Sequence, residues 1–319
     1  MRKACLDAVY EMALRDTRVV FIGSDLGAGT LDNFRRNLPD RFFMEGVSEA
    51  AIVGMMAGLA MSGRIPYMNT IAPFIVRRAC EQVALDACLH RFPLRFLASG
   101  GGVVYAPLGP THLAVEDIAL MRALPNMTVI APADAEEMRR LMPLTLDYPG
   151  PIYIRLAKGG DPIVTTAAGD FEIGRAIPMR QGRDALIVTT GVLLKSALES
   201  AQVLSQQGIE AGVLHVPTVK PFDTETMLDM ARHVRVVVTA EEHSIIGGLG
   251  SAVAEVLAEA AFDRPPRLAR LGFPDVFPDH YGSQAEHLAH YGLTSEGIRS
   301  AVLRLLDVVR PPHRETTPR

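Results

Sequence analysis

The sequence contains no tryptophan, only three cysteines and no marked excess of one charge. Lysine and arginine total 32 against 36 aspartate and glutamate residues, so the net charge of −4 gives no basic surface for nucleic acid or an anionic membrane. Cys5, Cys80 and Cys88 form no CxxC pair and are odd in number, which argues against a disulfide framework and favours a reducing compartment. No apolar run reaches the ~18 residues that a membrane span needs. The lack of tryptophan excludes nothing.

Several common catalytic signatures are also missing. The chain has no HExxH, GxSxG or Walker loop. The glycines at 247–252 (GGLGSA) lack the GxGxxG spacing of a dinucleotide site, and they predict close helix packing instead. Glu241, Glu242 and His243 are adjacent, which is not a metal-ligand spacing. The first 16 residues have the pattern of an amphipathic, partly acidic helix rather than of a signal peptide, so we expect a cytoplasmic protein.

What the sequence does contain is an alternation of strand and helix patterns. A chain of 319 residues fits two domains of about 150 residues each. Short β-branched runs alternate with helical patterns, which predicts an α/β fold of two domains, each built on a parallel sheet covered on both faces. The first domain is predicted at 1–160 and the second at 183–308. The Gly-, Pro- and Thr-rich segment 161–182 is typical of a linker, and 309–319 of a disordered tail.

The expected elements follow from these patterns. The first domain has helices at 2–15, 48–62, 74–91, 115–123 and 135–146, and strands at 19–23, 66–70, 94–98, 128–131 and 152–156. The second has strands at 185–190, 211–216 and 234–240, and helices at 193–206, at 224–232 and from about 247.

An ordered set of motifs resembles the transketolase and deoxyxylulose-phosphate synthase family. In the stretch FFMEGVSEAAIVGMMAGLAMSGRIPYMNTIAPFIVRRACEQV at 42–83, a glutamate opens a glycine-rich helix and a Thr-x-x-x-Phe stretch follows. The other blocks are VVFIGSDLG, GPTH, ALPNMTVIAPADAEEM, VPTVKPFD, VVVTAEEHSIIGGLGSAVAEVL and HYGLTSEGIRSAV. Each motif is weak alone, but their order over residues 2–306 is specific. The resemblance implies a pyrimidine-binding domain followed by a transketolase C-terminal domain.

The resemblance makes Glu49 the cofactor-activating residue. Thiamine chemistry needs a carboxyl group against the far ring nitrogen of the aminopyrimidine, because protonation there makes the amino group basic enough to deprotonate the thiazolium carbon. The competing interpretation is an acidic residue favoured by the helix dipole in a first turn. Glu45, one turn earlier, is the alternative if the register differs.

The same resemblance assigns further cofactor contacts. Phe74 matches the aromatic residue that stacks on the aminopyrimidine, with a core phenylalanine as the alternative. Ile71 stands where transketolases have a second aromatic residue, and Arg77 where they often have a tyrosine. Asp25, at the carboxyl end of a strand, matches the acid that approaches the cofactor across a subunit interface; a loop Asp that caps a turn is equally compatible with the sequence.

Substrate contacts are less firmly assigned. His112, in GPTH, matches the histidine that faces the substrate oxygens, although a solvated loop histidine is the alternative. Arg155 and Lys158 lie where the family has phosphate-binding arginines, and either could instead be a surface charge. Leu108 stands where transketolases have an acid that binds a sugar hydroxyl, and Gly100 where they have a histidine near the acceptor, so the substrate pair is left open.

One expected part of such an enzyme is missing from the sequence. The family holds the diphosphate through Mg²⁺ or another divalent ion bound by a GDG motif and a downstream Asn, whereas no asparagine follows Asn126 here. We therefore expect an N-terminal, diphosphate-binding partner subunit, with thiamine diphosphate between the two chains and two copies of each in a heterotetramer.

These expectations define a function and its rivals. The leading hypothesis is the C-terminal subunit of a split transketolase, a transferase active only with its partner, which moves a two-carbon ketol unit from a ketose (phosphate) donor to an acceptor. A beta subunit of a 2-oxoacid dehydrogenase-like decarboxylating component is the enzymatic alternative. A non-catalytic regulatory subunit of the same fold is the other, because Ile71, Leu108 and Gly100 alter the pocket.

Overall fold

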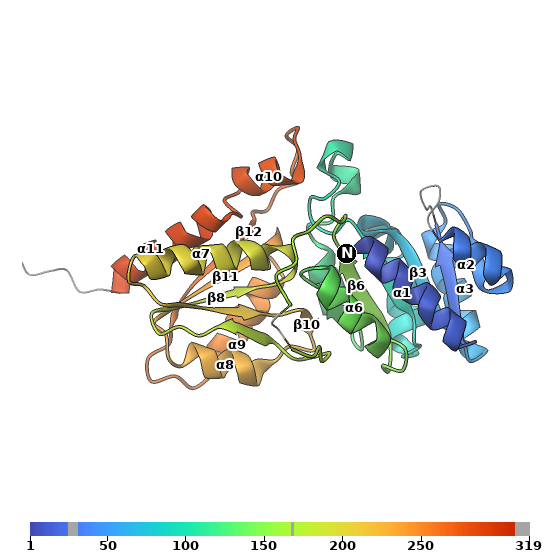
Figure 1. Ribbon diagram of the computed structural model, residues 1–319, viewed down its shortest axis with the longest axis horizontal. Coiled ribbons are helices and arrows are strands. Elements are labelled where there is room, and N and C mark those ends of the chain that lie inside the picture. Colours follow the sequence, from blue (N-terminus) through green and yellow to red (C-terminus); the bar gives the residue numbers. More distant parts are fainter. Residues whose placement is uncertain (25–30, 167–168, 310–319) are drawn as a thin grey trace, which may run out of the picture.

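The computed structural model describes residues 1–24, 31–166 and 169–309. Two sheets lie side by side, each flanked by helices, so the predicted two-domain α/β class is confirmed (Figure 1). Within the described ranges, no helix is both long and apolar enough to cross a membrane. No three His, Cys, Asp or Glu side chains in the described part of the chain are grouped so that they could hold a metal ion. All three cysteines are free.

The first sheet has seven strands in the order β10-β5-β6-β4-β3-β1-β2. The inner strands β1, β4 and β6 are buried at every residue, which explains why their sequences are mostly continuous apolar runs. All neighbours are parallel except β10 and β5, which pair antiparallel. β10 comes from the C-terminal half of the chain and forms one edge of the first sheet. The bounds are β1 Val19–Gly23, β2 Phe42–Met44, β3 Ile65–Ile71, β4 Arg95–Ser99, β5 Thr128–Ile130, β6 Ile152–Leu156 and β10 Thr218–Lys220.

Helices cover both faces of this sheet and divide its core in two. One apolar cluster lies under α1 Arg2–Arg15, α2 Asp32–Asn37 and α6 Ala135–Leu144. The other lies under α3 Glu49–Met61, η2 Phe74–Arg78, α4 Cys80–Gln82, η3 Val83–Leu89 and α5 Asp117–Ala123. The segment predicted as one helix over 74–91 is thus largely π-helical, in η2 and η3. Single π turns are rare and frequently accompany functional sites.

The second sheet has five strands in the order β12-β11-β8-β9-β7. Helices α7 Leu194–Gln206 and α11 Ser295–Val309 cover one face, and α8 Thr224–Ala231 and α9 Leu249–Glu259 the other (Figure 1). The strands are β7 Ile177–Arg180, β8 Ala185–Thr189, β9 Ala211–His215, β11 Val236–Ser244 and β12 Arg267–Phe273, and α10 is Gln284–His290. Short 3-10 helices are η1 Pro39–Arg41, η4 Ala106–Leu108, η5 Pro110–His112 and η6 Gly191–Leu193.

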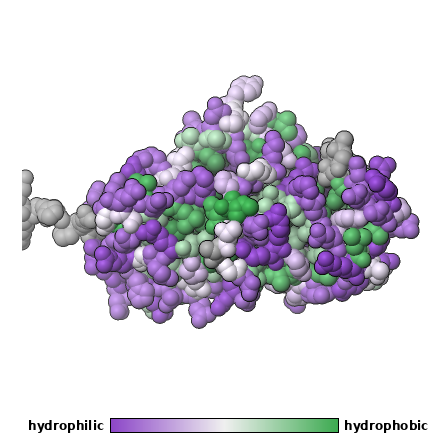
Figure 2. Space-filling view, viewed as in Figure 1, coloured by the Kyte–Doolittle hydropathy of each residue, from purple (hydrophilic) through white to green (hydrophobic). Residues whose placement is uncertain are grey.

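The C-terminal end of the predicted linker at 161–182 is a strand in the structure. Residues 177–180 form β7, which pairs antiparallel with β9 at the edge of the second sheet. Two aspartates bind described parts of the linker: Asp134 accepts hydrogen bonds from the backbone of Val164 and Thr165, and Asp223 from that of Ala176. On the face shown in Figure 2 the surface is mostly hydrophilic, with hydrophobic residues gathered near the middle, between the two domains. The predicted tail lies, apart from Val309, outside the described residues.

The glycines at 247–252 behave as the sequence predicts. A Cβ on Gly248 would overlap Oε2 of Glu241, and one on Gly250 would lie 2.8 Å from the Thr239 hydroxyl. Glu241 accepts hydrogen bonds from the backbone N–H groups of Leu249 and Gly250 at 2.7 and 2.8 Å, and so caps α9. Close packing at the start of α9, rather than dinucleotide binding, accounts for these glycines.

Candidate active site at the start of helix α3

Glu49 is the first residue of α3 and its side chain is fully buried. One carboxylate oxygen accepts a hydrogen bond from the Thr70 hydroxyl at 3.0 Å, and Thr70 in turn accepts one from the Ser24 hydroxyl. Ser24 directly follows β1, and Thr70 is the last residue but one of the neighbouring parallel strand β3, so these hydroxyls meet at the carboxyl edge of the sheet. Glu45 is exposed, and burial therefore distinguishes the two acids.

The second oxygen of Glu49 is bound by a residue that the sequence motifs did not single out. Arg78 donates from Nη1 to Oε2 of Glu49 at 2.6 Å. The Arg78 guanidinium also lies over the ring of Phe74, with Cζ 4.3 Å from the ring centroid. A flat, cationic group with N–H donors is thus held between a carboxylate and an aromatic face, which is the geometry that a protonated aminopyrimidine needs. The site fits that kind of group.

His112 lies next to Phe74, so two predicted contacts come together. The two ring centroids are 5.4 Å apart in an edge-to-face arrangement, and both residues are half-buried. His112 ends η5 in the loop between β4 and α5. Arg77 anchors this loop, because it donates to the carbonyls of Pro110 and Leu113 at 3.3 and 2.9 Å and pairs with Glu116. Arg77, predicted to stand where transketolases often have a tyrosine, therefore binds the loop that carries the histidine.

Arg155 is held inside the protein by an ion pair and several hydrogen bonds. Its side chain is buried and donates to both oxygens of Asp117, at 2.9 and 3.1 Å. It also donates to the carbonyls of Ala114 and Glu242. Burial acts to lower the pKa of Arg155, but the Coulombic attraction of Asp117 and Glu242 outweighs it and raises that pKa. Because its Nε and Nη2 groups are engaged inside the protein, the contacts of Arg155 favour a structural role, and its contact to a substrate phosphate stays a prediction.

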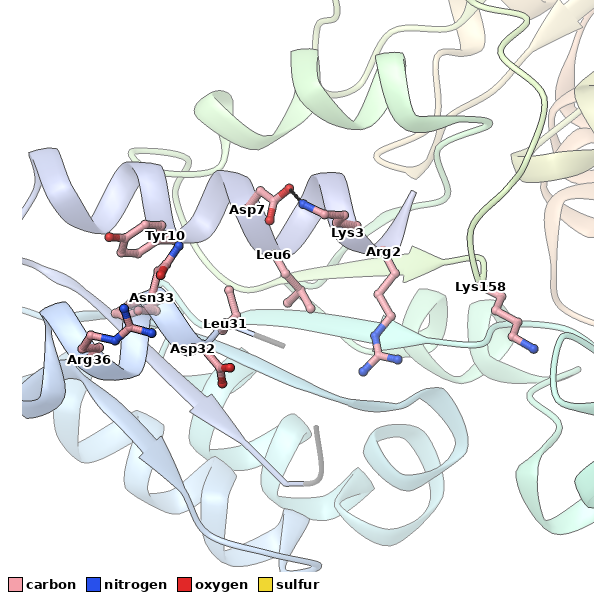
Figure 3. A pocket seen from close by; sticks show the side chains of 11 residues that line it. Arg2, Lys3, Leu6, Asp7, Tyr10, Leu31, Asp32, Asn33, Arg36 and Lys158 are labelled. Atoms are coloured by element: carbon pink, nitrogen blue, oxygen red, sulfur yellow. Dashed lines mark hydrogen bonds and ion pairs between the residues drawn. The ribbon is translucent and has the colours of Figure 1, made fainter. Parts of the chain in front are cut away.

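Lys158 lies apart from Glu49. It is exposed just beyond β6 and lines a cleft of about 630 Å³ between α1 and α2, on the opposite face of the sheet from α3. Figure 3 shows Arg2 and Lys158 toward one end of this cleft and Arg36 toward the other, with Asp32 between them. The cleft is polar and carries several cationic side chains, but it is not the site that contains Glu49.

The remaining predicted contacts are placed only in part. Ile71 ends β3, next to Thr70, and is half-buried. Asp25 lies outside the described residues. Thr70 and Arg78 were not predicted, although both leave a trace in the sequence. Thr70 opens the Thr-x-x-x-Phe motif, and Arg78 follows Phe74 by four residues, the spacing at which helical neighbours meet.

The fold and site define the class of protein: an α/β chain of two sheet domains with a buried acid at the start of a glycine-rich helix. Residues 1–160 match the model for the transketolase pyrimidine-binding domain, and residues 174–298 match that for the transketolase C-terminal domain. The chain belongs to the transketolase family.

Relatives of this chain include single subunits of transketolases. A 6-deoxy-6-sulfo-D-fructose transketolase subunit of a Clostridium species is 38% identical over 93% of this chain and 92% of that protein. One subunit of an apulose-4-phosphate transketolase of Phocaeicola vulgatus is 36% identical over 96% and 97%. A solved structure described as a split gene transketolase, inactive beta4 tetramer, has a TM-score of 0.87 and 38% identity, with 97% of this chain and 98% of that chain covered.

Proposed function

We propose that this chain is the C-terminal subunit of a thiamine-diphosphate-dependent split transketolase. It would transfer a two-carbon ketol unit from a ketose or ketose phosphate donor to an acceptor. The observation that carries the proposal is the fully buried Glu49 carboxylate, bound to Thr70 and facing a planar cation over Phe74. A chain with a transketolase pyrimidine-binding domain gives that carboxylate a specific task.

Each residue of the site has a role that its contacts support. Thiamine diphosphate, when bound, supplies a thiazolium carbon that becomes a nucleophile once its proton is removed. Glu49 would hold a proton at the far nitrogen of the aminopyrimidine, and the Thr70 hydroxyl orients the carboxylate by occupying its other oxygen. Phe74 provides the stacking face. His112, at the edge of Phe74, would donate a hydrogen bond to a substrate oxygen.

A partner subunit would complete the site. Two relatives are described as transketolase subunits, and the solved split-gene relative is described as an inactive beta4 tetramer. The outer face of α3, directly beyond Glu49, consists of Ala51, Gly54, Met55, Gly58 and Met61, all exposed and without a charge. Such an apolar face is suited to cover by another protein. We propose an N-terminal subunit there that holds the diphosphate and Mg²⁺, in a two-plus-two heterotetramer.

The donor class is part of the proposal. The names of the relatives include a sulfonated sugar and a sugar phosphate, both with an anionic terminal group. Lys158, the predicted contact for such a group, is exposed but lines the cleft on the opposite face of the sheet from α3, and Arg155 is engaged inside the protein. The residue that would bind the anionic group is therefore left open. Leu108 is 56% exposed on the histidine loop, where transketolases have a sugar-reading acid, so the hydroxyl pattern of the donor is left open.

The proposal is tested with the two purified subunits, thiamine diphosphate and Mg²⁺. Ketose cleavage without release of carbon dioxide is expected, whereas turnover of 2-oxoacids with carbon dioxide release would favour the decarboxylating alternative. Glu49→Gln should lower kcat by about 100-fold or more, the usual range for loss of a group that handles a proton in the transition state. The exposed Glu45→Gln is the matched control and should keep its activity. Equal activity of both variants with the assembly intact would instead indicate a non-catalytic subunit.

A further inference from the structure

The loop that carries His112 is closed at its base by backbone hydrogen bonds and is bound there by the second domain. Gly102 and Ala114 exchange two backbone hydrogen bonds, at 2.8 and 3.0 Å, so residues 102–114 form one closed loop. In Figure 1 this loop and the segment around α10 project from the same side of the molecule. The contacts at the loop base therefore decide where the histidine lies relative to Phe74.

Glu242 of β11 is the side chain that reaches from the second domain to this base. Its side chain is buried, and Oε1 accepts a hydrogen bond from the backbone N–H of Val103 at 2.9 Å. Gln284 of α10 donates to both oxygens of the same carboxylate, at 2.9 and 3.1 Å. Burial raises the pKa of Glu242, although Arg155 and the hydrogen bonds act in the opposite direction.

The neighbours of Glu242 extend this junction along the end of β11. His243 Nε2 accepts from the N–H of Ala119 at 3.2 Å, and the N–H of Ser244 donates to the carbonyl of Val115 at 2.7 Å. Consecutive residues of one strand thus bind the loop, the segment after it and α5. Glu242 is the member that binds the loop itself.

The sequence of the loop is adapted to this contact. Gly102 has φ +71°, and a Cβ built on it would lie 2.5 Å from the carboxyl carbon of Glu242. Any side chain at this position would push the carboxylate away from Val103, and the positive φ would be strained as well. The glycine allows the carboxylate to approach the backbone.

We propose that Glu242 is a positioning residue for the transfer reaction, through which the C-terminal domain sets the place of His112. The expected effect on kcat/KM rests on the proposed function, whereas the expected effect on the position of the loop does not. Without the carboxylate, the buried Val103 N–H has no acceptor, and the loop base can shift. The C-terminal domain then has a role in substrate handling although none of its residues needs to touch the substrate.

The test compares Glu242→Ala with Glu242→Gln in the two-subunit enzyme. Loss of a buried acceptor should lower kcat/KM for the ketose on the order of 10- to 100-fold in the alanine variant, while the Kd for thiamine diphosphate stays within about twofold. The glutamine variant keeps an acceptor for Val103 and should recover most of this loss. Hydrogen–deuterium exchange should be faster over 102–114 in the alanine variant of the chain, with or without a partner.

Glu241 offers the matched control, because it is a buried glutamate on the same strand that caps α9 within its own domain. Glu241→Ala should lower thermal stability and speed hydrogen–deuterium exchange at 249–253, yet leave kcat/KM near that of the unmodified enzyme. Unchanged exchange over 102–114 in Glu242→Ala would overturn the structural part of the proposal. Faster exchange with unchanged kcat/KM in an active enzyme would overturn the positioning role. If the unmodified pair cleaves no ketose, the proposed function fails, and the exchange result still decides whether Glu242 holds the loop.

Discussion

Glu45 and Glu49 lie close together in the sequence, yet only Glu49 is removed from water. A buried carboxylate is costly unless it is paired, and here Thr70 and Arg78 supply its partners. Sequence reasoning could choose Glu49 from its motif. It did not single out Arg78, because a four-residue spacing from Phe74 is common to many helices and gives no sign of the ion pair with Glu49.

Arg78 should compete with the cofactor for Glu49. It occupies the place between the carboxylate and the aromatic ring, so the pyrimidine can bind only after the ion pair opens. The Arg78 side chain is 43% exposed, and a partly exposed pair is worth about 1 kcal/mol, so Arg78→Ala should tighten the Kd for thiamine diphosphate about fivefold. Calorimetric titration of the two-subunit enzyme measures this. Arg78→Lys, which keeps the positive charge but lacks the planar guanidinium group, serves as the control. Weaker binding of thiamine diphosphate in Arg78→Ala would instead show that Arg78 contacts the cofactor directly.

The arrangement of the elements explains which of them the sequence could predict. The bounds of β1 and β6 agree with the prediction because both are buried central strands with continuous apolar runs. The short strands β2, β7 and β10 were not predicted, since each lies at a sheet edge and two of them pair antiparallel with residues distant in sequence. Edge strands of three or four residues carry no periodic signal.

Asp134 links α6 to the linker, and its ionisation should contribute to stability. It caps α6 through the N–H groups of Glu136 and Glu137 and accepts from both the N–H and the hydroxyl of Thr165. Burial opposes the charged form, but these hydrogen bonds prevail and lower the pKa of Asp134 below its usual value.

A lowered carboxyl pKa has a defined sign for stability. The contribution is present above the unfolded-state pKa near 4 and is lost as the pH falls through the lower folded-state value. Asp134→Asn, which resembles the neutral acid, should therefore reduce the free energy of unfolding by about 2 kcal/mol at pH 7. Urea unfolding at pH 7 and pH 3 should show that the difference in unfolding free energy between the unmodified chain and Asp134→Asn is smaller at pH 3. A difference of equal size at both values would contradict the account.

At the scale of the whole molecule, the two domains share apolar and polar contacts. One core cluster contains Val103, Leu113 and Ala133 of the first domain together with residues of the second sheet. β10 extends the first sheet from the second half of the chain, and Arg155 bridges Asp117 to the backbone of Glu242. These contacts join the histidine loop to both domains, while the exposed face of α3 is where we place the proposed partner.

The most direct measurement is a calorimetric titration of thiamine diphosphate with Mg²⁺ into each subunit alone and into their mixture. The account predicts tight binding only in the mixture, and a Kd raised by about tenfold or more when Glu49→Ala replaces the unmodified chain, since a charge-assisted hydrogen bond is then lost. Glu45→Ala should leave the Kd unchanged. Equally tight binding by this chain alone, or undiminished binding in the Glu49→Ala mixture, would contradict a shared site built around the Glu49 carboxylate.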